Sequence, residues 1–244
     1  MRAFGRGFRW PSNLGVAALN ELLVRLISPA GVVGFALEAE KHRWGLMNNV
    51  TIPYVIAMVV AFIVFDFAIY VQHVIFHAVP ALWRVHRMHH ADLDLDVTTG
   101  SRFHPIEILL SLGFKLAVVG VLGPPAAAVL IFEVVLNATS MFNHSNFRIA
   151  ENIDSWMRLL VVTPDMHRVH HSIEVSETNS NFGFNLPWWD RLLGTYLGQP
   201  RADHEQMTIG INLFRNPEEL RLGRMLLQPF SAEAGDYPIS RRAT

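Results

Sequence analysis

Residues 53–71 make up the cleanest apolar stretch of the chain, and this stretch restricts the available folds most strongly. It reads PYVIAMVVAFIVFDFAIYV, and Asp66 is its only charged residue. A helix of this length crosses a hydrocarbon core of about 30 Å. Of all 244 residues, 51% are hydrophobic and only 17% are charged. The sequence therefore predicts an integral membrane protein rather than a soluble domain.

Three further segments are candidates for the membrane. Residues 106–122 and 126–142 are apolar and flank a Gly-Pro-Pro turn, so they are expected to form a helical hairpin. Residues 14–37 contain a Glu, an Arg and a Pro, which fits either a broken transmembrane helix or a helix lying in the interface. We expect a crossing. The predicted fold is all-α, a membrane bundle of about four transmembrane helices.

The order of these segments predicts an orientation. If the amino terminus is cytoplasmic, every histidine cluster lies on the cytoplasmic side. The basic carboxyl-terminal tail lies there as well, together with Arg84, Arg87, Arg102, Arg148, Arg158 and Arg168. The opposite side holds the 38–50 loop, whose charges offset one another, and the uncharged turn. This is the positive-inside pattern, and it predicts a cytoplasmic, histidine-rich cap.

Eight of the twelve histidines fall into three clusters, and two of these share the pattern H-x-x-H-H. The clusters are His73 and His77; His86, His89 and His90; and His167, His170 and His171. Residues three and four apart share one face of a helix, so each cluster aims several imidazoles at one region. Neutral imidazole is a ligand for iron, zinc, copper and nickel. The alternative is a set of buried, hydrogen-bonded histidines without metal, but burying so many polar rings is costly.

The four other histidines have different surroundings. His144 lies at the end of an apolar segment between two asparagines, and we predict that it is a metal ligand. His104 precedes a proline at the start of the 106–122 segment, where a ligand and a supporting role are equally compatible with the sequence. His42 and His204 stand alone among charged residues and are expected to be solvated.

Polar residues within the apolar segments form two helical stripes. Asp66 and Tyr70 precede the first histidine pair, and Glu133, Asn137 and Ser140 precede His144 at matching intervals. Ionisable groups inside a membrane span are costly and mark functional sites by default. We expect these five side chains to support the metal ligands or to line a cavity.

Lys115 is predicted to pair with Glu133. The hairpin places both residues at similar depth, because Lys115 lies eight residues before Gly123 and Glu133 lies nine after Pro124. Asp66 is the competing acceptor for the lysine. The alternative is that one or both charges reach the interface or solvent.

Several functions are disfavoured by composition. The chain has no cysteine, which removes disulfides, cysteine-ligated iron–sulfur clusters and thiolate ligation of haem or zinc. A net charge of −1 gives no sign of a nucleic-acid partner. No G-x-G-x-x-G motif for NAD or flavin is present, and we expect no bound flavin, haem or NAD.

Taken together, six motifs resemble the fatty acid hydroxylase/sterol desaturase superfamily, in particular its bacterial sterol desaturase members. They are HVIFH (73–77), HRMHH (86–90), RFHPIE (102–107), NHSN (143–146), TPDMHRVHH (163–171) and WWDRLLGTY (188–196). The resemblance covers roughly residues 50–198. It divides the chain into an N-terminal membrane-associated segment (1–49), a di-metal domain (50–198) and a C-terminal cytoplasmic tail (199–244).

The resemblance implies a membrane oxygenase with a histidine-ligated di-iron centre, in which zinc can replace iron on isolation. The family's ligands correspond to the eight clustered histidines and to His144. Some members have a second histidine where this chain has Ser140, and His104 is the candidate that would supply the missing ligand.

The implied reaction hydroxylates or desaturates a lipid C–H bond with O2. Its substrate would be a sterol, fatty acyl or related long-chain lipid. A separate ferredoxin, cytochrome b5-like protein or reductase would supply electrons, and the location would be the bacterial inner membrane. Two alternatives are a zinc-dependent membrane hydrolase and a histidine-based metal-binding or transport protein. A hydrolase would leave too many of the histidines unexplained, and the sequence contains no H-E-x-x-H motif. A transporter would be expected to place its ligands at mid-span, whereas the clusters here lie at one membrane face.

Overall fold

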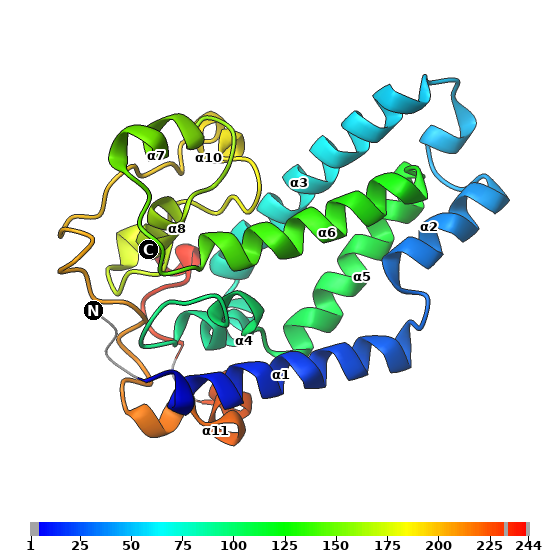
Figure 1. Ribbon diagram of the computed structural model, residues 1–244. Helices are drawn as coiled ribbons and strands as arrows, with labels where there is room; N and C mark the ends of the chain where they lie inside the picture. Colours follow the sequence, from blue (N-terminus) through cyan, green and yellow to red (C-terminus); the bar gives the residue numbers. More distant parts are fainter. Residues whose placement is uncertain (1–4, 232–233, 243–244) are drawn as a thin grey trace.

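The computed structural model describes residues 5–231 and 234–242, and the regular elements within these ranges are all helical. Figure 1 shows long helices forming a bundle and short helices gathered at one end of it as a cap. The long helices are α1 (Arg6–Ile27), α2 (Gly31–His42), α3 (Tyr54–Ala78), α5 (Pro105–Leu122) and α6 (Ala126–Asn143). The shorter α-helices are α4 (Pro80–His90), α7 (Glu151–Met157), α8 (Pro164–His170), α9 (Val175–Thr178), α10 (Trp188–Leu192) and α11 (Leu222–Leu227). Short 3-10 turns are η1 (Met47–Asn49), η2 (Thr99–Ser101), η3 (Pro217–Leu220), η4 (Gln228–Phe230) and η5 (Ile239–Arg242).

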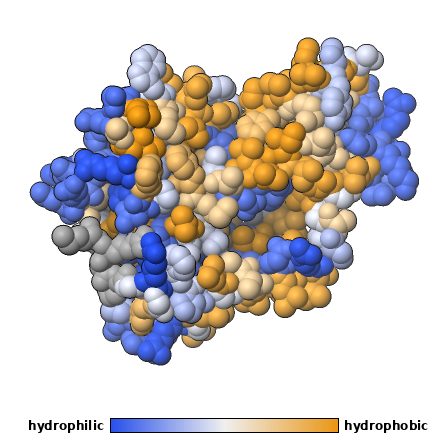
Figure 2. Space-filling view, viewed as in Figure 1, coloured by the Kyte–Doolittle hydropathy of each residue, from blue (hydrophilic) through white to orange (hydrophobic). Residues whose placement is uncertain are grey.

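Four stretches of the described chain are long and apolar enough to cross a membrane, which agrees with the predicted all-α membrane bundle. They are Arg6–Asn49, Tyr54–Ala78, Pro105–Leu122 and Ala126–Asn143. The first is broken, because α1 ends at Ile27 and α2 begins at Gly31, on either side of Pro29. Apolar side chains cover the outer surface of α3 and α6, which appears in orange in Figure 2.

The far end of the bundle, opposite the cap, is closed by two turns in contact. The amide of Leu46 donates to the carbonyl oxygen of Val121 at 2.9 Å. Gly123 ends α5 in a left-handed conformation with φ 62°, and a Cβ there would lie 2.4 Å from the carbonyl oxygen of Trp44. Only glycine fits this position, so the α5–α6 hairpin turns tightly against the α2–α3 connection.

The interior of the bundle is apolar. Phe65 of α3 and Phe132 of α6 are almost fully buried and lie 5.2 Å apart between ring centroids. Val119 of α5 and Ala36 of α2 are fully buried in the same cluster. This packing holds α2, α3, α5 and α6 together and fixes the direction in which α3 and α6 deliver their histidines to the cap.

The described residues after 198 include a segment that packs against α4 within the cap. The rings of Tyr237 and Trp83 are fully buried and stack with centroids 5.3 Å apart. The Trp83 Nε1–H donates to the carbonyl oxygen of Ala234 at 3.1 Å. Arg84 donates to the carbonyl oxygen of Pro229 at 2.8 Å. The sequence shows no periodicity here because this contact is made by loops and single aromatic side chains.

The start of α1 is anchored to the cap by a buried ionic network. The Arg9 guanidinium makes two hydrogen bonds to the Asp92 carboxylate, at 2.8 and 2.7 Å, and a third to Asp96 at 2.8 Å. The side chains of Arg9 and Asp92 have no solvent exposure. The carbonyl oxygen of Phe103 accepts from Asn20, further along α1. Helix α1 is therefore joined to the cap by buried polar contacts.

Candidate metal centre

Nine histidines form two adjacent, buried groups. In each group the candidate ligand atoms lie within 4.8 Å of one another. The first group contains His73, His77, His86, His90 and His170, and the second contains His89, His144, His167 and His171. All eight clustered histidines and His144 are thus brought together.

The repeated H-x-x-H-H pattern divides between the two groups. In α4, His86 and His90 are four residues apart and enter the first group, whereas His89 enters the second. In and just after α8, the pair four apart, His167 and His171, enters the second group, and His170 enters the first. Successive helical residues differ by about 100° in direction, so the adjacent histidines of each H-H pair diverge. Each pattern therefore supplies both groups.

Carbonyl and carboxylate oxygens fix the ring orientation in the first group. The Nδ1–H of His73 donates to the carbonyl oxygen of Phe182 at 2.8 Å. The Nδ1–H of His86 donates to Glu107 Oε1 at 2.6 Å. These oxygens only accept, so Nδ1 of each ring carries the proton and Nε2 presents a lone pair. The two Nε2 atoms face each other at 3.2 Å.

Other rings are held in the same way. The Nδ1–H of His144 donates to the carbonyl oxygen of Ser140 at 2.6 Å, and that of His170 donates to the carbonyl oxygen of Ser180 at 2.7 Å. His77 donates through Nδ1 to Asn179 Oδ1 at 3.0 Å. Metal-bound histidines commonly donate their second N–H to an oxygen of this kind, which fixes the tautomer.

The spacing of the nitrogens fits coordination to a cation. His144 Nε2 lies 3.1 Å from His89 Nε2, 3.0 Å from His167 Nε2 and 3.2 Å from His171 Nε2. Metal–imidazole bonds of about 2.0–2.1 Å place neighbouring ligands roughly 3 Å apart when they meet at a right angle. Where both tautomers leave Nε2 unprotonated, as for His73 and His86, the converging lone pairs repel each other, and a bound cation would remove this repulsion. The donor set fits two metal ions, one per group.

Burial keeps these rings neutral, which is the form that binds metal. Burial, reinforced by neighbouring imidazoles, lowers the pKa of the cap histidines well below the ordinary value of 6.5. This group comprises His89, His90, His167, His170 and His171. Burial likewise lowers the pKa of His144 to about 4.

A loss of stability in acid is expected for the metal-free protein. These histidines have a lower pKa when folded than when unfolded, so below pH 6.5 the unfolded chain binds more protons. Each ring that stays neutral lowers the free energy of unfolding by about 1.4 kcal/mol per pH unit below that value. Melting of chelator-treated protein in detergent should be constant from pH 8 to 7 and fall from pH 6.5 to 5. A constant melting temperature down to pH 5 would contradict neutral burial.

The structure places His104 outside both groups. Its Nδ1 accepts a hydrogen bond from the amide of Ile106, where it caps the start of α5. Its Nε2–H donates to the carbonyl oxygen of Leu226 at 3.3 Å. Both ring nitrogens are used by the backbone, so this histidine joins α5 to the end of α11 instead of completing the ligand set.

The two polar stripes have different surroundings. On α3, Asp66 accepts from the indole N–H of Trp189 at 2.7 Å, and the Tyr70 hydroxyl bonds Thr195 at 2.9 Å. These residues join α3 to the cap. On α6, three predicted residues line a cavity of about 400 Å³ beside His73 and His86. They are Glu133, Asn137 and Ser140.

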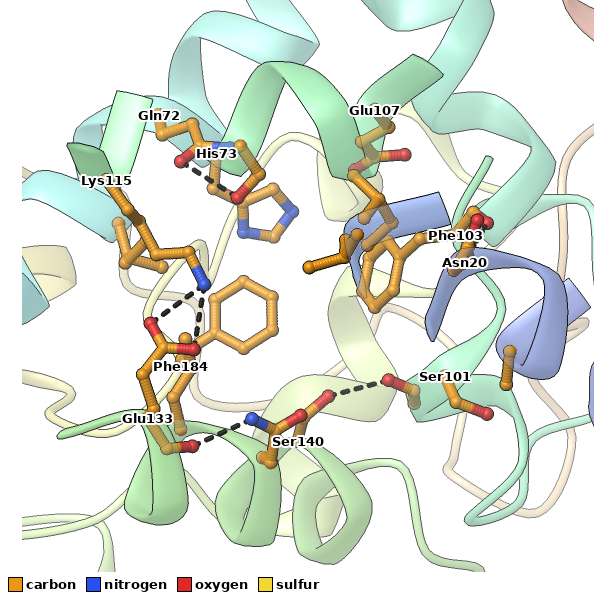
Figure 3. A pocket seen from close by; sticks show the side chains of 18 of the residues that line it. Asn20, Gln72, His73, Ser101, Phe103, Glu107, Lys115, Glu133, Ser140 and Phe184 are labelled. Atoms are coloured by element: carbon orange, nitrogen blue, oxygen red, sulfur yellow. Dashed lines mark hydrogen bonds and ion pairs between the residues drawn. The ribbon is translucent and has the colours of Figure 1, made fainter. Parts of the chain in front are cut away.

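Lys115 and Glu133 are in contact at the cavity wall. The Lys115 ammonium lies 2.8 Å from Glu133 Oε1 and donates to Oε2 at 2.9 Å. Figure 3 shows this pair on one side of the cavity, with Phe103 and Asn20 on the other. Asp66 is not the partner of Lys115, because its carboxylate accepts a hydrogen bond from Trp189 of the cap.

Some residues around the histidines were not singled out from the sequence. Glu107 is the clearest, because its side chain is 7% exposed and holds His86. The sequence feature that could have indicated Glu107 is a carboxylate three residues after a histidine, in HPIE, at the start of an apolar helix. Asn179 lies in a polar loop and carries no comparable signal. The backbone carbonyl oxygens of Phe182 and Ser180 also hold histidines, and the type of side chain at these positions does not predict this role.

The fold and the site together define an integral membrane protein with a cap that contains two histidine groups, each of which could hold a metal ion. Residues 58–195 match the fatty acid hydroxylase family. This match covers more than half of the chain and includes all nine grouped histidines. The chain therefore belongs to the fatty acid hydroxylase family, which confirms the resemblance to the fatty acid hydroxylase/sterol desaturase superfamily.

Relatives with known names are lipid hydroxylases and monooxygenases. Ornithine lipid hydroxylase from Rhizobium tropici is 32% identical over 85% of this chain and 59% of its own length. Human alkylglycerol monooxygenase is 28% identical over 62% of this chain and 32% of its own length. Human cholesterol 25-hydroxylase is 30% identical over 54% of this chain and 48% of its own length. The chain thus matches less than two thirds of each relative. No solved structure matches the chain.

Proposed function

We propose that this protein is a membrane-bound oxygenase that holds two iron ions and hydroxylates a C–H bond of a lipid with O2. The observation that carries the proposal is the pair of converging imidazole groups, in which Nε2 atoms lie 3.0–3.2 Å apart. Bound iron would supply the activation of O2 that no amino-acid side chain provides. The names of the relatives favour hydroxylation over desaturation.

The protein's own residues would hold the metals, position the substrate and exclude water. The five histidines of the first group would bind one ion, and the four of the second would bind the other. Glu107 and Asn179 would keep His86 and His77 in the tautomer that binds metal. The cavity beside His73 and His86 would receive the lipid from the bilayer, with Phe103 and Phe184 on its wall. A substrate held there loses translational freedom and lies away from bulk water.

The orientation and the electron supply form part of the same proposal. The excess of arginine at the cap end supports a cytoplasmic cap, in a bacterial inner membrane, by the positive-inside pattern. A separate ferredoxin, cytochrome b5-like protein or reductase would deliver electrons from that side.

Metal content is the direct test. Protein purified without oxygen is expected to contain two irons per chain and to incorporate one oxygen atom from labelled O2 into a membrane lipid when reduced. The matched control is His42→Ala, which removes a half-exposed histidine at the far end of the bundle. This control should retain both irons and full activity. Stoichiometric zinc in protein purified without oxygen, together with no O2 consumption when O2 is then added to the reduced protein, would refute the oxygenase and favour zinc-dependent hydrolysis.

A further inference from the structure

The cavity beside the first histidine group has a mostly apolar wall, into which charged and polar side chains are set at membrane depth. It lies between α1, α3, α5 and α6, and His73 and His86 are part of its wall. Gln72, Ser111 and Asn137 also line it, in addition to the Lys115–Glu133 pair. In Figure 3 the polar ends of Lys115 and Glu133 point toward the interior of the cavity. A cavity that received only a hydrocarbon chain would leave Lys115 and Glu133 out of water with only each other as charged partners.

The Lys115–Glu133 pair joins α5 to α6 and is accessible from the cavity. The two side chains are 15% and 22% exposed, whereas the neighbouring core residues Val119 and Phe132 are fully buried. Replacing a buried ion pair by apolar residues of similar volume is often neutral or stabilising. A charge pair within membrane spans is therefore a candidate for function rather than for packing.

A second ion pair borders the cavity on α1. Glu21 lines the cavity and pairs with Arg25, and these side chains are 62% and 75% exposed. Figure 2 shows a hollow between α6 and α1, with hydrophilic residues at its edge and apolar surface around it. One opposite-charge pair thus lies on the exposed surface of α1 at the edge of the cavity, and another lies inside the cavity.

The balance of charge indicates the class of ligand. Lys115 and Glu133 together are neutral, so a ligand of single charge that binds one of them leaves the other unpaired. A ligand with one positive and one negative group satisfies both, and exchanges one ion pair for two. Because an unpaired charge in a desolvated site costs several kcal/mol, the pair discriminates in favour of such a ligand.

We propose that Lys115 and Glu133 bind the zwitterionic head group of the lipid substrate. The acidic group of the head group would lie at Lys115 and its ammonium group at Glu133. Since the same cavity is walled by His73 and His86, the carbons close to the head group would lie beside the first histidine group. The oxidised position would then be in or next to the head group rather than at the far end of a hydrocarbon tail. The statement about oxidation rests on the proposed function, whereas the head-group binding does not.

Lipid retention by the purified protein tests the head-group site. Three probes with identical acyl chains are compared in detergent: phosphatidylethanolamine, phosphatidylglycerol and diacylglycerol. Native mass spectrometry and thermal melting measure binding without any turnover. Wild-type protein is expected to bind phosphatidylethanolamine at least about tenfold more tightly than the other two. Equal binding of diacylglycerol would overturn the proposal, because it would show that the cavity selects hydrocarbon.

An exchange of the two charges separates recognition from structure. The variant K115E/E133K keeps an ion pair between α5 and α6 but reverses its polarity. We expect melting close to that of wild type and at least about tenfold weaker binding of phosphatidylethanolamine. Unchanged binding would assign the pair a structural role only and overturn the proposal. If the exchange unfolds the protein, K115Q/E133Q replaces it, with the same expected loss of lipid selectivity and the same refuting outcome.

A matched control and the iron content complete the test. R148E/E205R exchanges an exposed ion pair on the cap, with side chains 69% and 73% exposed, and should leave lipid selectivity unchanged. Loss of selectivity in this control would assign the effect to charge exchange in general and overturn the proposal. Iron content distinguishes the two proposals: wild type that selects phosphatidylethanolamine but holds no iron refutes the oxygenase alone. Protein that holds two irons and oxidises lipid without head-group selectivity refutes the head-group site alone.

Discussion

Replacing His144 with alanine is expected to remove one metal ion per chain and to lower lipid oxidation by more than about a hundredfold. His144 lies at the centre of the second group, with its Nε2 within 3.2 Å of the Nε2 atoms of His89, His167 and His171. Loss of an outer hydrogen-bond partner of a metal ligand already costs about ten- to a hundredfold in affinity or activity. Loss of a central ligand in a group of four should exceed that range.

The metal count makes this prediction specific. The His144→Ala variant should retain about one iron per chain, because the five histidines of the first group remain. A variant that keeps two irons and most of its activity would show that His144 is not a ligand. His204→Ala is a suitable control, since His204 lies outside both groups yet is also a partly buried histidine near the cap. Metal analysis and product formation measured on the same preparations separate loss of metal from loss of fold.

Much of the fold could be predicted because hydrophobic length is a local property of the sequence. The apolar stretches after Pro53, His104 and Pro125 each became a helix, because prolines mark their starts and Gly123 marks the end of α5. The bounds of α5 and α6 are nearly those expected, whereas α3 continues to Ala78, beyond the expected end at residue 71. The packing of the last segment on α4 could not be predicted. It depends on single long-range contacts such as Trp83 with Tyr237, and these leave no periodic pattern.

The candidate site was predictable for the histidines and less so for their supports. Spacings of three and four residues placed imidazoles on common helix faces. The division into two groups was not predicted, because it follows from how α3, α4 and α8 converge. The same limit applies to His104. Its position before a helix is compatible with a metal ligand and equally with the N-cap of α5, which is the role it has in the structure. Backbone acceptors such as the Phe182 carbonyl oxygen were beyond any reasoning from side-chain type.

Replacing Arg9 with methionine is expected to lower the free energy of unfolding by about 3–5 kcal/mol. Arg9 makes three side-chain hydrogen bonds to Asp92 and Asp96, and its side chain is fully buried. Its removal leaves the Asp92 carboxylate buried with only the more distant Arg102, at 3.7 Å, as a cationic partner. The pKa of Asp92 shows the dependence: burial raises it, but Arg102 and Arg9 together bring it below its ordinary value. Thermal and chemical unfolding in detergent measure the effect.

A second substitution identifies the cause of that loss. Adding Asp92→Asn to Arg9→Met removes the uncompensated carboxylate, so the double variant should recover part of the stability. Arg221→Met, which breaks an exposed pair with Glu218 on the cap, should cost less than about 1 kcal/mol. Because α1 precedes the residues that match the family, 58–195, the comparison also tests whether this helix belongs to the folded unit of the metal centre. If Arg9→Met were as mild as Arg221→Met, α1 would be a peripheral attachment; a large loss, partly restored by Asp92→Asn, requires that α1 and the cap fold together.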